Sequence, residues 1–178
     1  MSKISVVIPH VPKNKELDDS LDQCIKSLKG QYDELILVIN DGIGFAKAFN
    51  QGFKYATGDF IYAVSNDTKL IAGDLRKMAV PDCVVSPIVN GRFQSYWACF
   101  FAMPRSVYEK TGGFNEEYGL AYYEDDDFII RLDELGIPMK GTREVEISHE
   151  GGKTVKALGK EEDAKAFGRE VFLKKHGV

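Results

Sequence analysis

An unbroken acidic run, Glu-Asp-Asp-Asp at residues 124–127, is followed by apolar residues at the spacing of one helical face, from Phe128 to Leu135. The acids therefore occupy the first turn of a predicted helix. Acidic side chains there interact favourably with the free N–H groups and the helix dipole, each by about 0.3–1 kcal/mol. That structural role accounts for one or two acids, whereas four adjacent charges repel one another. We expect either solvent screening or a cationic group near this run.

A second candidate is Asp67, which lies in the sequence Asn66-Asp67-Thr68 directly after an apolar run at residues 60–64. A lone Asp at this place is often only a helix cap or a turn residue. The alternative is a carboxylate that binds a divalent cation, which would neutralise a diphosphate. Mg²⁺ and Mn²⁺ suit oxygen ligands and need few protein ligands besides phosphate and water.

His149 is a third candidate, because Gly151, Gly152, Lys153 and Thr154 follow it. A single His is more often a surface or core residue than a ligand. Here flexible glycines, a cation and a hydroxyl could together wrap around phosphate. The other two histidines, at positions 10 and 176, have no such neighbours.

The Gly42-Ile43-Gly44 sequence invites a comparison with dinucleotide-binding loops. The match is weak, because Lys47 occupies the position where a small residue is needed for close helix–strand packing, and because the motif follows the second predicted strand. These glycines are expected to shape the loop and to leave Lys47 free to face an anionic ligand.

The elements that position these residues begin with three buried strands, at residues 4–8, 35–39 and 60–64, separated by amphipathic helices at about residues 17–28 and 45–55. This order predicts a parallel sheet with right-handed crossovers. Ligands of such sheets bind beyond the carboxyl ends of the strands. Three loops should meet there, at residues 9–13, 40–44 and 65–69.

The second half has a different pattern. Residues 83–89 and 95–102 are predicted to be strands, antiparallel around residues 90–92, and Pro104 begins a short helix. A strand at residues 145–149 and a loop at residues 150–154 follow the acidic helix. A charged helix from about residue 160 to 175 closes the sequence.

Composition limits the class of protein. The 178 residues, 44% hydrophobic and 28% charged, are ordinary for one soluble domain, and a net charge of −4 argues against a general nucleic-acid binder. Cys24, Cys83 and Cys99 lack CxxC spacing and indicate reduced buried thiols. The first apolar run is too short for a signal peptide or a spanning helix. We expect a cytoplasmic location, compatible with peripheral contact with a membrane.

The order of these motifs resembles that of GT-A-fold glycosyltransferases of the large family 2 group. Five segments carry the resemblance, from residue 4 to about residue 154: ISVVIPHV, ELILVINDG, GFAKAFNQGFKYATGDFIYAVSNDT, TGGFNEEYGLAYYEDDDFIIRL and ISHEGG. Each segment alone is loose, but their order and spacing together are specific. The resemblance implies an α/β GT-A fold, with a mostly parallel central sheet flanked by helices and a small antiparallel acceptor-side portion.

The resemblance also implies a domain plan and a donor site. A single domain, 1–178, would have a nucleotide-binding half at about 1–80, an acceptor half at about 81–155 and a terminal helix at 156–178. The nucleotide would contact Pro9, Val11, Asn40, Asp41, Lys47, Asn50, Asn66 and Asp67. Asn40 replaces the family's usual Asp, and Asn66 replaces the first acid of its DxD motif. Asp67 and His149 would bind Mn²⁺ or Mg²⁺.

Catalysis by such an enzyme would transfer a sugar from a UDP-, GDP- or dTDP-sugar to a hydroxyl acceptor (a glycan, lipid-linked sugar or protein), with inversion. A sugar hydroxyl has a high pKa, so a carboxylate must take its proton as it attacks. The resemblance assigns this general-base role to Asp125, with Glu124 as the alternative. Asp127 would support the motif, and Trp97 would face the acceptor unless it is packed in the core.

Two alternatives stay open. A sugar nucleotidyltransferase usually carries a Gly-rich, basic first loop, and the sequence PHVPKNKE has no such glycines. A non-catalytic nucleotide-sugar-binding protein could keep the same fold, and only an assay of turnover separates it from an enzyme.

Overall fold

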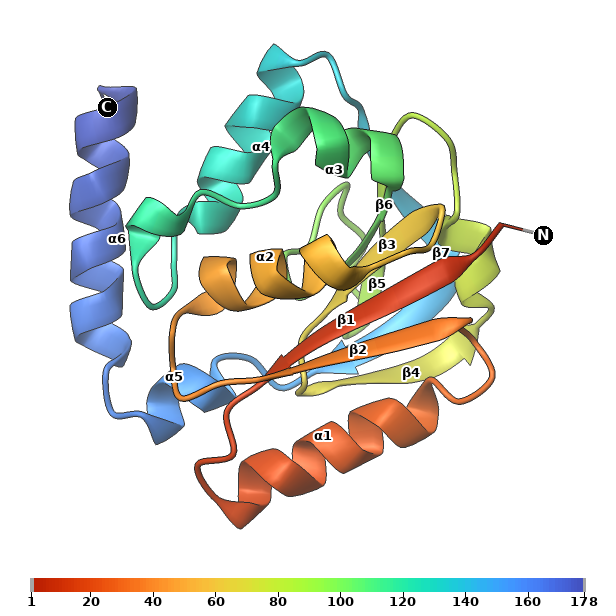
Figure 1. Cartoon of the computed structure of the whole chain (residues 1–178), viewed down its shortest axis with the longest axis horizontal. Helices are drawn as coiled ribbons and strands as arrows, with labels where there is room; N and C mark the ends of the chain where they lie inside the picture. Colours follow the sequence, from red (N-terminus) through yellow and green to blue (C-terminus); the bar gives the residue numbers. More distant parts are fainter. Residues whose placement is uncertain (1, 178) are drawn as a thin grey trace.

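A single seven-stranded sheet runs through the computed structural model, which describes residues 2–177 (Figure 1). The strands are β1 (Ile4–His10), β2 (Glu34–Ile39), β3 (Phe60–Val64), β4 (Thr68–Gly73), β5 (Val84–Val89), β6 (Phe100–Pro104) and β7 (Met139–His149). Their order across the sheet is β2-β1-β3-β6-β5-β7-β4. Five strands point one way, whereas β6 and β4 run antiparallel to their neighbours. The predicted mostly parallel sheet is confirmed.

Helices cover both faces of this sheet. They are α1 (Lys15–Ser27), α2 (Phe45–Tyr55), α3 (Arg105–Thr111), α4 (Glu124–Glu134), α5 (Lys153–Ala157) and α6 (Glu161–His176), with 3₁₀ turns η1 (Leu75–Met78) and η2 (Glu116–Tyr118). In Figure 1, α1 lies on one face, and α2, α3 and α4 lie on the other. The result is an α/β/α arrangement, with α6 standing at one side of the molecule.

The two faces explain why β1 is apolar throughout. Val6 packs into the core on the α1 side together with Leu21, whereas its neighbour Val7 packs against Phe49 on the α2 side. A strand buried on both faces needs no polar alternation. Each large side chain buried in this way stabilises the fold by about 1.5–3 kcal/mol.

The edges of the sheet differ from the expectation. The strand β2 was expected to be buried, but it is an edge strand, with Leu37 40% exposed and Ile39 56% exposed. The predicted loop at residues 65–69 leads into β4, where no strand was predicted, and β4 pairs antiparallel with β7 at the opposite edge. Because β4 is half-exposed and carries a charge at Lys69, its run of apolar residues is too short to predict a strand.

In the second half, the predicted antiparallel pair is confirmed, since Val85 lies opposite Ala102. The predicted strand at residues 95–102 begins only at Phe100, however. The preceding residues form a loop, in which the Trp97 amide donates to Ser86 Oγ at 2.9 Å. The predicted loop at residues 150–154 also runs directly into the short helix α5.

The remaining expectations concern helices and cysteines. The predicted helices at residues 45–55 and 160–175 match α2 and α6. Cys24, Cys83 and Cys99 are buried free thiols, as expected. Within residues 2–177, no helix combines the length and the apolarity that crossing a membrane requires.

Candidate functional site

A cavity of about 250 Å³ lies beyond the carboxyl ends of β1, β2 and β3. The three predicted loops contribute to its wall, as do the start of α4 and the segment after β7. The candidate residues that line it are Pro9, Val11, Asn40, Asn66, Asp67, Glu124, Asp125 and His149. The fold therefore brings together eight residues that the sequence spreads over about 140 positions.

Asp67 and His149 form a pair in this cavity. His149 Nε2 lies 3.2 Å from Asp67 Oδ1, and the Gly151 amide donates to Asp67 Oδ2 at 3.1 Å. Burial would raise the pKa of Asp67, but the hydrogen bond from His149 holds it below its usual value. Burial would likewise lower the pKa of His149, but hydrogen bonds with Asp67 and Cys99 raise it to about 10. Without a cation, the two side chains therefore form an ion pair at neutral pH, and a cation would have to displace the His149 proton to bind Nε2.

The chemistry of this pair fits a divalent cation that also has phosphate ligands. A carboxylate oxygen and an imidazole nitrogen are both ligands that Mn²⁺ accepts. In the part of the chain that the structure describes, no group of three or more His, Cys, Asp or Glu side chains is arranged to hold a metal. Asp67 and His149 would therefore hold a cation only together with a diphosphate and water.

Glu124 and Asp125 line the same cavity from the first turn of α4. Glu124 is 4% exposed, and its Oε2 atom is buried without a hydrogen-bond partner among the described residues. Burial, followed by the charge of Asp125, raises the pKa of Glu124 to about 8. Burial and the charge of Asp126 also raise the pKa of Asp125. The raised pKa favours the neutral form of Glu124 at pH 7.

The turn before these carboxylates has an unusual backbone. Tyr122 and Tyr123 have φ angles of 79° and 71°, in the left-handed region that residues other than glycine rarely adopt. Each such residue costs roughly 1 kcal/mol or more and persists only when its surroundings hold it. Here α6 packs on the turn at Gly168, where an added Cβ would lie 2.5 Å from the Tyr122 carbonyl oxygen. This close approach fixes where α4 begins.

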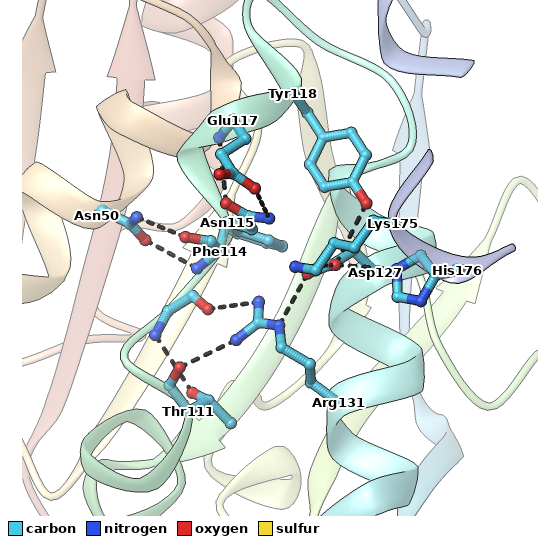
Figure 2. A network of polar contacts seen from close by, with 11 residues as sticks. Asn50, Thr111, Phe114, Asn115, Glu117, Tyr118, Asp127, Arg131, Lys175 and His176 are labelled. Carbon is cyan, nitrogen blue, oxygen red and sulfur yellow. Dashed lines mark hydrogen bonds and ion pairs between the residues drawn. The ribbon is translucent and has the colours of Figure 1, made fainter. Parts of the chain in front are cut away.

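Asp127 faces away from the cavity, into a polar network that Figure 2 shows. It is fully buried, and its oxygens lie 2.8 Å from Arg131 Nε, 2.7 Å from Lys175 Nζ and 3.1 Å from His176 Nε2. The Tyr118 hydroxyl also donates to it, at 3.2 Å. The cationic group expected near the acidic run is therefore present, but it neutralises only this fourth acid. The exposed Asp126 is left to solvent.

Both polar atoms of the Asn40 side chain form hydrogen bonds with the backbone around its own loop. Its Nδ2 donates to the carbonyl oxygens of His10 and Val38, and its Oδ1 accepts from the amides of Gly42 and Ile43. An Asp could not make the two donor contacts. This explains locally why Asn stands at this position.

Other predicted site residues lie off the cavity wall. Asp41 and Lys47 are exposed, and the buried Asn50 ties α2 to Phe114 through hydrogen bonds to both its carbonyl oxygen and its amide. Trp97 lines a second hollow, which shares His149 with the main cavity. No finding tests the roles of these residues, which stay predictions.

His10 and the apolar part of the wall were not predicted as site residues; the apolar part includes Phe45, Phe49, Leu120 and Leu158. His10 directly follows Pro9 at the end of a predicted strand, so its place at the loop edge was a signal for it. The apolar residues gave no such signal, because their spacing is that of ordinary core positions. Buried polar atoms without partners among residues 2–177 also lie at Tyr96 Oη and Trp97 Nε1.

This sheet, with its strand order and the helices on both faces, is the GT-A fold of nucleotide-sugar glycosyltransferases. No family model and no curated protein sequence matches the chain. Solved structures do, with low sequence identity. A mutant of Drosophila β-1,4-galactosyltransferase 7, solved with manganese, UDP-Gal and xylobiose, aligns with 15% identity over 88% of this chain and 74% of its own, with a TM-score of 0.64.

Two further structures come from microorganisms. A mannosyltransferase from Pyrobaculum calidifontis, in complex with GDP-Man and Mn²⁺, aligns with 16% identity over 85% of this chain and 58% of its own, with a TM-score of 0.63. Glucosyl-3-phosphoglycerate synthase from Mycobacterium tuberculosis, solved with Mn²⁺, UDP and glucosyl-3-phosphoglycerate, shares 16% identity over 99% of this chain and 81% of its own, with a TM-score of 0.59. At these identities the likeness establishes the fold.

Proposed function

We propose that this protein is a glycosyltransferase of the family 2 type, which transfers a sugar from a nucleoside-diphosphate sugar to a hydroxyl acceptor with inversion. The observation that carries the proposal is the composition of one cavity. The Asp67–His149 pair and the Asp125 carboxylate both line it, so a diphosphate and a general base have places in the same space. The fold shared with three glycosyltransferases supports the same reading.

The two acids of α4 would have different roles. Asp125 is the better general base, because burial raises its pKa and hence its affinity for the proton of the acceptor hydroxyl. As that proton leaves, the acceptor oxygen attacks the anomeric carbon and the bond to the diphosphate oxygen breaks. Glu124, in its neutral form, would donate a hydrogen bond that positions the acceptor. Glu124 lines the cavity in which the acceptor would lie.

Asp67 and His149 would hold Mn²⁺ or Mg²⁺ together with the diphosphate. When bound, the cation would supply charge that stabilises the departing nucleoside diphosphate. Lys153 also lines the cavity, and it is held by Glu150 at 2.6 Å and by Ser20 Oγ at 3.0 Å. Glu16 also lies 3.3 Å from this ammonium group, so a bound diphosphate would share Lys153 with two carboxylates.

The donor and the acceptor classes follow from the neighbours and from the wall. The similar structures contain UDP-Gal, GDP-Man or UDP, so UDP- and GDP-sugars are the first donors to test, with dTDP-sugars next. Trp97 lines the second hollow next to His149, so a saccharide acceptor could stack on its indole ring there.

The test is an assay of sugar transfer and donor hydrolysis by the purified protein, with Mn²⁺ and a panel of UDP-, GDP- and dTDP-sugars. We expect turnover with one donor class. Asp125→Asn should lower its kcat by about 10²- to 10⁴-fold, whereas Asp126→Asn, its exposed neighbour, should leave the rate unchanged. Nucleotide binding that depends on Mn²⁺, without turnover of any donor, would instead favour a non-catalytic nucleotide-sugar-binding protein.

A further inference from the structure

His10 connects three segments of the cavity wall. It ends β1 and is 3% exposed. Its carbonyl oxygen accepts from the Asn40 amide at 3.0 Å. On the imidazole, Nε2 lies 2.9 Å from Asp18 Oδ1 and Nδ1 lies 2.9 Å from Asn66 Nδ2. One buried side chain therefore links α1 to the residue beside Asp67.

The chemistry of these contacts fixes the direction of the Asn66 amide. Asp18 is a carboxylate and can only accept, so His10 Nε2 carries the proton. The Asn66 NH₂ group is the part of the amide that faces the other ring nitrogen, with Nδ2 lying 2.9 Å from His10 Nδ1, so Nδ1 is the acceptor of this contact. The carbonyl oxygen of the Asn66 amide must point away from His10.

That oxygen is available to a ligand. Asn66 is 5% exposed and lines the cavity, yet its Oδ1 makes no hydrogen bond to any of residues 2–177. It is also absent from the buried atoms that lack a partner, so solvent reaches it. The next residue, Asp67, is held by His149 and Gly151.

We propose that His10 is a positioning residue, which holds the Asn66 amide with its oxygen toward the ligand in the cavity. This inference rests on the proposed function, in which that ligand is a cation with the diphosphate of the donor. An oxygen turned toward such a ligand attracts the cation, whereas an NH₂ group in its place would repel it. A carboxylate at position 66 would present an oxygen to the ligand in either orientation, because both of its terminal atoms are oxygens. The Asn66 amide needs His10 to hold its oxygen on the side of the ligand.

Two substitutions distinguish the roles of the two ring nitrogens of His10. In His10→Asn, the side-chain oxygen can take the place of Nδ1 and accept from Asn66. In His10→Gln, the side-chain NH₂ can take the place of Nε2 and keep the Asp18 contact, but the acceptor for Asn66 is lost. Both variants remove the imidazole ring from the same buried position, but they differ by one methylene group, worth about 0.8 kcal/mol when buried, so the stability of each is measured as well.

The first measurement is the affinity of each variant for UDP and for GDP with Mn²⁺, by calorimetry. We expect His10→Gln to bind the cognate nucleotide about tenfold more weakly than His10→Asn, since one orienting hydrogen bond is at stake. Equal weakening in both variants, at equal stability against denaturant, would reduce His10 to a packing role and overturn the inference.

The second measurement does not depend on the proposed function. ¹⁵N NMR of the imidazole should show a proton on Nε2 and none on Nδ1, and the Asn66 NH₂ protons should exchange slowly in the wild type and in His10→Asn but not in His10→Gln. A protonated Nδ1 would overturn the inference. If the NMR result holds while no nucleotide binds with Mn²⁺, the proposed function fails and so does the role of Asn66 toward a ligand.

Discussion

Lys175 Nζ lies 2.7 Å from Asp127 Oδ1, and this ion pair connects the last turn of α6 to the first turn of α4. Asp127 is only two residues from Asp125, the candidate base. Gly168 on the same helix packs on the left-handed turn that precedes Glu124. The terminal helix is thus part of the support for the candidate catalytic carboxylates, although it contributes no side chain to the wall of the cavity.

The first prediction concerns Asp127. Asp127→Asn should lower the free energy of unfolding by roughly 3 kcal/mol, because it leaves Arg131 and Lys175 without their buried partner. Asp126→Asn is the matched control in the same turn, and its exposed side chain should change stability by less than about 0.5 kcal/mol. Urea denaturation of both variants measures the difference. Equal effects would mean that the network contributes nothing specific.

The same carboxylate should make the protein sensitive to acid. Burial opposes its charge, but hydrogen bonds from Lys175 and Arg131 hold the pKa of Asp127 below its usual value. Its stabilising contribution is therefore complete above its unfolded pKa, about 3.9, and is lost as the pH falls through the lower folded value. The stability difference between the wild type and Asp127→Asn should shrink below about pH 4. A difference that stays constant from pH 6 to pH 3 would contradict this account.

We expect the contribution of Glu124 to stability to have the opposite dependence on pH. With the pKa of Glu124 raised to about 8 in the folded state, its contribution to stability is complete below its unfolded pKa, about 4.3, and is lost as the pH rises through about 8. Glu124→Gln removes this titration. Its melting temperature relative to wild type should therefore rise between pH 5 and pH 8.5, as measured by differential scanning fluorimetry. Glu170→Gln on the exposed side of α6 is the control, and a flat difference for Glu124→Gln would refute the burial argument.

Gly168 gives a prediction in which two effects oppose each other. In an exposed helix, Gly→Ala stabilises by about 0.8–1 kcal/mol. At Gly168 the new Cβ would lie 2.5 Å from the Tyr122 carbonyl oxygen, so Gly168→Ala should instead destabilise by about 1–3 kcal/mol. It should also lower any transferase activity by displacing the start of α4. Glu170→Ala, exposed on the same helix, is the control, and a Gly168→Ala variant that gains stability would show that α6 is not closely packed on this turn.

Replacing Asn40 by Asp tests the hydrogen bonds that its side-chain NH₂ group donates. Asn40→Asp would place carboxylate oxygens against the carbonyl oxygens of His10 and Val38, in place of two hydrogen bonds. We expect a loss of about 1–3 kcal/mol in the free energy of unfolding. Asp41→Asn, at the exposed neighbouring position, should change stability little. If Asn40→Asp left the free energy of unfolding unchanged, the loop would be able to reorganise around a carboxylate.

Much of the fold followed from the sequence, because the signals for it are local. Continuous apolar runs gave β1 and β3, and a period of 3.6 gave α2 and α4 within a residue or two. The place of β4 did not follow, since it depends on pairing with β7, about 75 positions further along the chain. The exposure of β2 did not follow either, because an apolar run does not say whether a strand lies at the edge of its sheet.

For the site, the sequence by itself determined which residue types stand at strand ends and at the start of α4, and so it indicated Asp67, His149, Glu124 and Asp125 as candidates. Only the tertiary structure decided how they differ. Neighbouring carboxylates have the same chemistry in the sequence, but Asp127 is turned into a cationic network, whereas Glu124 Oε2 is buried without a partner among residues 2–177. His10 likewise gained its role only from contacts with Asp18 and Asn66. The physical reason is that burial and distant partners set a side chain's charge and direction, and neither is encoded in local spacing.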